Sequence, residues 1–144
     1  MKTNLQRGKA LAGFRQLVSV LKFSDEELIP TIIQDAKSKQ VLTLCYLNRE
    51  ALRKSLQTGT VYLFRRSQQT LMRKGETSGH IQFIQSIAVD CEGKSLVFFV
   101  RQRVAACHAG YFSCYFRILS HLGRLQVQSR KVFDPKKVYK GVSK

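Results

Sequence analysis

The chain has 144 residues, of which 44% are hydrophobic, so it has the size of one ordinary domain and can bury a substantial core. It carries 25 Lys and Arg against 9 Asp and Glu, a formal net charge of +16, which attracts polyanions such as nucleic acid, phosphorylated metabolites or an anionic membrane surface. No apolar run approaches the length of a membrane span, which excludes a protein that crosses the bilayer by a helix.

Residues 1–21 are predicted to form a basic, amphipathic N-terminal extension. Leu11, Phe14, Leu17 and Leu21 recur at spacings of three and four, the period of a helix with one apolar face. The favoured interpretation is a helix packed on the domain surface, although a basic, acid-free start is also typical of an organelle transit peptide. Because the start lacks the apolar core of a secretory signal, we expect a cytoplasmic protein, with organelle targeting as the alternative.

Residues 22–122 are predicted to form the domain itself. Two strands joined by a polar turn are expected in "LIPTIIQDAKSKQVLTLCYLN", with Cys45 as a core thiol. A helix is expected in "NREALRKSLQTG", where Asn48 can cap the start and Gly59 can end it. Further strands are predicted in "TVYLFRRS", "HIQFIQSIAV", "SLVFFVRQ" and "YFSCYFRIL". The fold class that follows is strand-rich α+β, as a single compact domain.

Residues 123–144 are predicted to be a basic C-terminal tail, with one turn signal at Asp134-Pro135. From Gly93 to Lys144 there are eleven Lys or Arg and a single acid. This part of the chain either lies against a negative partner, with nucleic acid as one possibility, or is simply solvated.

Three of the four cysteines, Cys91, Cys107 and Cys114, lie close together in the sequence. Thiolates are soft ligands that suit zinc, and three protein ligands leave a fourth tetrahedral position for water. There is no C-x-x-C pair, so the spacing alone is also compatible with small apolar residues in strands. His108 follows Cys107 directly and can be a ligand, a general base or a hydrogen-bonded strand residue.

A second cluster of polar residues lies in "MRKGETSGHIQ". Its small residues can present backbone N–H groups and a cation to a phosphate, and the arginines just before it can add guanidinium forks. A polar hairpin loop would have a similar composition. The residues expected to bind substrate are Arg66, Lys74, Glu76, Thr77, Ser78 and His80.

The order of these motifs resembles the phosphoribosyl-AMP cyclohydrolase family over residues 22–140. The motifs that carry the resemblance are "RKGETSGH", "VDCEGKSLVFF", "AACHAGYFSCYFR" and "KVFDPKKVY". The resemblance implies an enzyme of histidine biosynthesis that opens the adenine ring of 1-(5-phosphoribosyl)-AMP at the N1–C6 bond with a zinc-activated water. It further implies an intertwined homodimer, in which Cys91 of one subunit joins Cys107 and Cys114 of the other on zinc, and a catalytic role for His108.

The chain departs from the family at the segment that resembles a magnesium site, Asp-Cys-Asp-x-Asp in the family and Asp90-Cys91-Glu92-Gly93-Lys94 here. Magnesium requires hard oxygen ligands in tight octahedral geometry. Asp90 and Glu92 are the carboxylates left to hold it, and Lys94 puts a cation where a carboxylate is usual. The sequence therefore favours zinc as the cofactor and argues against magnesium at this segment.

Other substitutions leave two alternatives to a working cyclohydrolase. Arg101 replaces an acid, and Tyr111 and Phe112 replace a pair of arginines of the family. One alternative is a zinc-stabilised scaffold without catalysis that binds nucleic acid or a ribonucleoprotein assembly through its basic surface. The other is a related hydrolase of a different nucleotide, with Tyr111 or Phe112 stacked on a base.

Overall fold

The computed structural model describes residues 4–139. The chain forms α1 (Asn4–Val20), β1 (Ile29–Asp35), β2 (Val41–Leu47), α2 (Arg49–Thr58), β3 (Tyr62–Arg65), β4 (Thr70–Arg73), β5 (Gln82–Val89), β6 (Leu96–Gln102), β7 (Arg117–Leu119), β8 (Leu125–Val127) and α3 (Pro135–Val138). The strand-rich α+β domain predicted from the sequence is confirmed.

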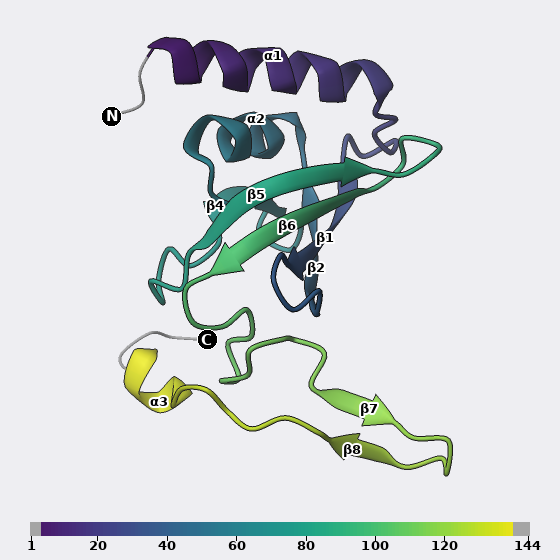
Figure 1. Cartoon of the computed structure of the whole chain (residues 1–144), viewed down its shortest axis with the longest axis vertical. Coiled ribbons are helices and arrows are strands. Elements are labelled where there is room, and N and C mark those ends of the chain that lie inside the picture. Colours follow the sequence, from purple (N-terminus) through teal and green to yellow (C-terminus); the bar gives the residue numbers. More distant parts are fainter. Residues whose placement is uncertain (1–3, 140–144) are drawn as a thin grey trace.

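The centre of the domain is a four-stranded sheet with strand order β2-β1-β6-β5 (Figure 1). Strand β1 pairs antiparallel with β2 and parallel with β6, and β5 pairs antiparallel with β6. Alternate residues of β1 and β6 are buried, so one face of these strands forms the core. Ile29, Ile33 and Phe98 are completely buried there.

Both predicted helices of the N-terminal half are present. In α2 the Asn48 side chain accepts a hydrogen bond from Ala51 N at 2.8 Å, and Gly59 ends the helix in the left-handed conformation, at a φ of 70°. Helix α1 lies across α2 (Figure 1), and Phe14 and Leu17 pack against the core of the domain.

No helix among residues 4–139 is both long enough and apolar enough to span a membrane.

The turn between β5 and β6 is held by the chain that leaves α1. Lys22 N donates to Gly93 O at 2.7 Å. Gly93 has a φ of +71°, and a Cβ at this position would lie 2.0 Å from Val20 O. Only glycine fits here, because both the backbone conformation and the contact exclude a side chain. This turn also carries Cys91, so the end of α1 fixes the position of that cysteine.

The prediction of a strand over "YFSCYFRIL" is wrong for most of its length. Residues 103–116 form an irregular loop, and regular pairing begins at Arg117 in β7. In place of strand pairing, the loop makes individual hydrogen bonds to β2: Ser113 Oγ donates to Val41 O at 2.6 Å and Cys114 N donates to Leu42 O at 2.7 Å. The loop is therefore anchored to the start of β2.

Two short hairpins were also not predicted in full. The segment "TVYLFRRS" contributes only β3, which turns back at residues 66–69 to pair with β4. Strands β7 and β8 form a hairpin that projects from the domain (Figure 1), and all residues of both strands are exposed. Leu119 and Leu122 in this hairpin are 67% and 74% exposed.

Candidate active site

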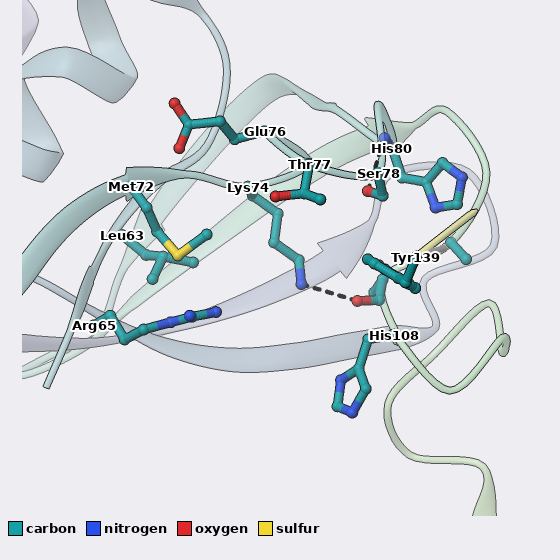
Figure 2. A pocket seen from close by; sticks show the side chains of 13 residues that line it. Leu63, Arg65, Met72, Lys74, Glu76, Thr77, Ser78, His80, His108 and Tyr139 are labelled. Carbon is teal, nitrogen blue, oxygen red and sulfur yellow. Dashed lines mark hydrogen bonds between the residues drawn. The ribbon is translucent and has the colours of Figure 1, made fainter. Parts of the chain in front are cut away.

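Six of the residues predicted to act in binding or catalysis line one cavity of about 210 Å³ (Figure 2). These residues are Lys74, Glu76, Thr77, Ser78, His80 and His108. The loop between β4 and β5 supplies the first five, and the irregular loop after β6 supplies the sixth. Two segments far apart in the sequence, each singled out by its motif, thus meet at one pocket.

The loop from Lys74 to His80 is a tight structure whose shape depends on glycine. Gly75 has a φ of +87°, and a Cβ there would lie 2.6 Å from the carbonyl carbon of His80. Gly79 N donates to Gly75 O at 2.8 Å, and His80 N donates to Ser78 Oγ at 3.1 Å. These short contacts fold the loop back on itself, so its polar side chains project from a fixed backbone.

Lys74 connects the two halves of the pocket. Its Nζ donates to Ala106 O at 2.9 Å, the dashed line in Figure 2, which places the ammonium next to the segment that carries Cys107. Partial burial lowers the pKa of His80, and the nearby charges of Arg103 and Lys74 lower it further. The His80 imidazole is therefore mostly neutral at pH 7 and can accept as well as donate a hydrogen bond.

Cys107 and Cys114 are brought into contact with each other by the irregular loop. Ala106 N donates to Phe112 O at 3.0 Å and Cys107 N donates to Tyr111 O at 3.2 Å, which closes the loop between the two cysteines. Burial raises the pKa of the Cys114 thiol, while a hydrogen bond with Thr43 and the charge of Lys74 oppose this shift.

The chemistry of this pair fits zinc. Two adjacent thiols are a soft donor set, and Ala109 N already donates to Cys107 Sγ at 3.4 Å, as expected of an N–H that supports a thiolate ligand. Within residues 4–139 of a single chain, however, no three His, Cys, Asp or Glu side chains are close enough to hold a metal together. The pair is two-thirds of the predicted ligand set.

Cys91 lies at the other end of the domain from this pair. It is exposed in the turn that precedes β6, whereas Cys107 and Cys114 follow β6 (Figure 1). The seven residues of β6 span about 23 Å at the usual rise of a strand. Cys91 is therefore too far from Cys107 and Cys114 to share one ion with them within a single chain.

Asp90 and Glu92 do not fit a magnesium ion. Asp90 Oδ1 accepts hydrogen bonds from Glu92 N at 3.0 Å and Lys94 N at 2.9 Å, and Oδ2 accepts one from Ser95 Oγ at 2.6 Å. These bonds, led by the one from Ser95, lower the pKa of Asp90. Glu92 is paired with Lys94 at 2.8 Å. The segment thus keeps two carboxylates, one of them paired with Lys94, and supplies a cation where a further hard oxygen ligand would be needed.

Two arginines predicted together are separated by the structure. Arg65 lines the cavity, whereas Arg66 lies outside it, with its guanidinium 3.8 Å from the centre of the Tyr46 ring. This leaves Arg65 as the arginine of the pair that can reach a ligand in the pocket of its own chain.

Cys45 is also outside the site: it is a buried core thiol, as predicted, and burial raises its pKa to about 12.

The sequence analysis missed Tyr139, which lines the same cavity from the C-terminal end of the chain. The motif "KVFDPKKVY" contributed to the family resemblance, but its basic composition favoured a solvated tail. A pattern in the sequence could have predicted that this segment packs on the domain. Asp134-Pro135 is typical of the start of a helix, and apolar residues flank it on both sides: Val132, Phe133, Val138 and Tyr139.

The chain is thus a single α+β domain whose pocket is lined by two cationic side chains, Arg65 and Lys74, together with hydroxyls and two histidines. The chain belongs to the phosphoribosyl-AMP cyclohydrolase family, whose model matches residues 43–116.

Curated relatives support the same assignment over most of the chain. The phosphoribosyl-AMP cyclohydrolase of Pelotomaculum thermopropionicum is 43% identical over 119 residues, which cover 83% of this chain and 92% of the relative. The protein of the same name from Methanosarcina barkeri is 46% identical over 117 residues, 81% of this chain and 88% of the relative. The histidine biosynthesis bifunctional protein HisIE of Thermoanaerobacter pseudethanolicus is 48% identical over 123 residues, and the match covers 85% of this chain and 56% of that protein.

Proposed function

We propose that the protein is a phosphoribosyl-AMP cyclohydrolase of histidine biosynthesis, which hydrolyses the N1–C6 bond of the adenine ring of 1-(5-phosphoribosyl)-AMP. The observation that carries the proposal is the meeting of the Lys74–His80 loop with the Cys107-His108 segment at one pocket, joined by the hydrogen bond from Lys74 to Ala106. Relatives that bear this enzyme name match most of the chain. We further propose a cytoplasmic location, with organelle targeting by the N-terminal extension as the alternative.

The substrate has two phosphates, and the pocket offers cations and small polar groups to hold them. Lys74 and Arg65 supply positive charge, and Thr77 and Ser78 supply hydroxyl donors. A cavity of about 210 Å³ lies below the range of roughly 300–1,000 Å³ that is usual for small-molecule sites. One chain therefore encloses part of the substrate, and we infer that a second copy encloses the rest.

Cys107 and Cys114, with Cys91 of a second copy, would hold the zinc ion. Zinc bound there supplies a Lewis acid that lowers the pKa of a coordinated water and makes it a nucleophile near neutral pH. His108 is exposed and lines the pocket one residue from Cys107, so it can accept a proton from the attacking water and return one to the nitrogen that leaves the ring.

We infer a homodimer in which each site is shared between the two subunits. The separation of Cys91 from Cys107 along β6 requires a second copy if all three thiolates bind one ion. The projecting β7–β8 hairpin supports an intertwined arrangement, because Leu119, Leu122 and Leu125 are between 63% and 74% exposed in one chain. A protein of this size rarely leaves so many leucines of one hairpin in water.

Replacement of His108 by Gln is expected to lower kcat by about 100- to 10,000-fold, because the variant keeps hydrogen bonding but cannot transfer a proton. The measurement is steady-state turnover of phosphoribosyl-AMP, with zinc content determined on the same sample. His108→Ala leaves a gap beside an exposed position, so added imidazole should restore part of its activity. Full activity in both variants would remove His108 from the mechanism.

Magnesium is expected to have no effect on turnover by the zinc-loaded protein. The segment offers only the carboxylates of Asp90 and Glu92, and Lys94, which pairs with Glu92, puts a cation where a third oxygen ligand would be needed. Turnover measured in a titration of magnesium, starting from a chelator that spares zinc, checks this. A rate that rises in proportion to magnesium occupancy would contradict it.

A substitution at Lys94 is expected to create the metal binding that this segment lacks. Lys94→Asp removes the cation and adds a carboxylate, so Mn²⁺ binding, read from the loss of the free-ion paramagnetic signal, should appear in this variant. Lys94→Ala removes the cation without adding an oxygen ligand and serves as the matched control. Equal Mn²⁺ binding by both variants would show that Lys94 does not decide the metal preference.

The experiment that tests the proposed function itself is hydrolysis of phosphoribosyl-AMP by the purified, zinc-loaded protein, followed by the absorbance change as the purine ring opens. Turnover would establish the activity. A folded, zinc-containing protein without turnover would leave the basic surface as the place to look for function. Nucleic-acid binding that weakens steeply as salt rises would then be the next measurement.

A further inference from the structure

The C-terminal segment from Val132 to Tyr139 returns to the active site and is anchored there at two points. The first anchor is the loop between the two zinc-site cysteines, where Val132 N donates to Gly110 O at 2.7 Å. Gly110 has a φ of +104°, and a Cβ at this position would lie 2.8 Å from Phe133 O. The close approach of the two backbones therefore depends on the absence of a side chain at Gly110.

The second anchor is the end of the Lys74–His80 loop. The ring of Phe133 meets the ring of His80 edge-on, with centroids 4.7 Å apart and planes at 78°. The segment thus contacts both loops that form the pocket, one on each side. Neither contact is expected of a solvated tail, and Phe133 is half-buried although the segment around it is rich in lysine.

Beyond Phe133 the chain forms one turn of helix that delivers Tyr139 to the cavity. Asp134 caps α3 by accepting a hydrogen bond from Lys136 N at 3.0 Å, and Pro135 occupies the first turn. Tyr139 N donates to Pro135 O at 2.9 Å, which closes the turn. The Tyr139 ring lies 6.3 Å from that of Phe133 and lines the pocket with Lys74 and Ser78 (Figure 2).

We propose that residues 132–139 form a wall of the substrate site and that the ring of Tyr139 contacts the purine of the bound nucleotide. This inference rests on the proposed function. Tyr139 is the one phenol among the described residues that line the cavity, and the cations and hydroxyls around it suit phosphate and ribose. A flat aromatic ring is the side chain on which a base stacks, with little dependence on which base it is.

The proposal can be tested by fluorescence, because the chain contains no tryptophan. Tyr139→Trp places a single indole in the pocket, and titration with AMP is expected to quench its emission until the site is saturated. Leu11→Trp, on the exposed face of α1 at a position 47% exposed, is the matched control and should not respond. An indole at position 139 whose emission AMP leaves unchanged, while calorimetry records AMP binding to the unchanged protein, would overturn the proposal.

Kinetics give a second readout that also applies if AMP alone does not bind. Tyr139→Ala is expected to raise KM by about 10-fold, the scale of a lost stacking contact, with a smaller effect on kcat. Tyr139→Phe keeps the ring and should recover most of that loss. If Tyr139→Ala retains the KM of the unchanged protein, the proposal is wrong, whereas the proposed function stands as long as the unchanged protein hydrolyses phosphoribosyl-AMP. If the unchanged protein has no turnover, the proposed function fails, and the fluorescence titration still decides whether a nucleotide contacts residue 139.

Discussion

Replacement of either Cys107 or Cys114 by Ala is expected to remove bound zinc and to abolish turnover of phosphoribosyl-AMP. The two side chains are in contact with each other and, in the proposed site, supply two of three thiolates, so the loss of one would leave too few soft ligands to retain the ion. The measurement is zinc per chain after dialysis against a weak chelator, together with turnover. Because each change shortens one side chain of an irregular loop and leaves the central sheet intact, the variants should remain folded, which circular dichroism can verify.

The chain provides its own matched control for this experiment. Cys45→Ala removes a cysteine that is buried in β2 and does not line the pocket. It should keep its zinc and its turnover, and lose about 1 kcal/mol of unfolding free energy from the buried sulfur. A Cys107→Ala protein that still binds one zinc per chain, or a Cys45→Ala protein that loses zinc, would contradict the ligand set proposed here.

Mixing two inactive variants is expected to restore activity. In the proposed dimer, a Cys91→Ala subunit keeps Cys107 and Cys114, and a Cys107→Ala subunit keeps Cys91. A mixed dimer therefore has one intact site and one site that lacks two ligands. If subunits are refolded together in equal amounts, half of the dimers are mixed, and turnover should reach about a quarter of that of the unchanged protein.

Complementation of this kind distinguishes a site shared between two subunits from a site formed within one chain. If all ligands came from a single chain, every site in the mixture would lack a cysteine and no turnover would return. A mixture of Cys107→Ala with Cys114→Ala is the control, because both changes fall on the same side of each site and no intact combination exists. Recovery in that control would indicate that the variants are not fully inactive on their own.

The helices α1 and α2 and the strands of the central sheet could be predicted from local patterns, whereas the short β3–β4 hairpin was predicted only in part. The cap at Asn48, the glycine at the end of α2 and the alternation in β1 and β6 act over a few residues, so they are visible in the sequence. The loop over residues 103–116 could not be predicted in this way. Its aromatic and cysteine-containing composition is typical of a strand, and its path is set by hydrogen bonds to Val41 and Leu42, far away in the sequence.

The sequence predicted most of the residues of the candidate site, but it did not predict how they are arranged around the pocket. Composition and motif singled out the Lys74–His80 loop and His108, and the structure brings them to one pocket. Sequence alone could not tell that Arg65 and not Arg66 faces the pocket, because the end of β3 is set by its pairing with β4, which leaves Arg65 as the last strand residue and puts Arg66 in the turn. Tyr139 was not predicted as a site residue, because its position depends on the contact of Phe133 with His80, which is far away in the sequence.

The contact between the end of α1 and the turn at Gly93 has a consequence for inheritance. The backbone of Lys22 and Val20 fixes a turn whose cysteine, in the proposed dimer, serves the neighbouring subunit. Damage to the N-terminal helix of one copy would thus be felt at the metal of the other. A mutation there, or at Gly93, would disable the partner's site in a mixed dimer but leave the defective copy's own site, which takes its Cys91 from the intact copy, so activity would fall only in proportion to the share of defective copies.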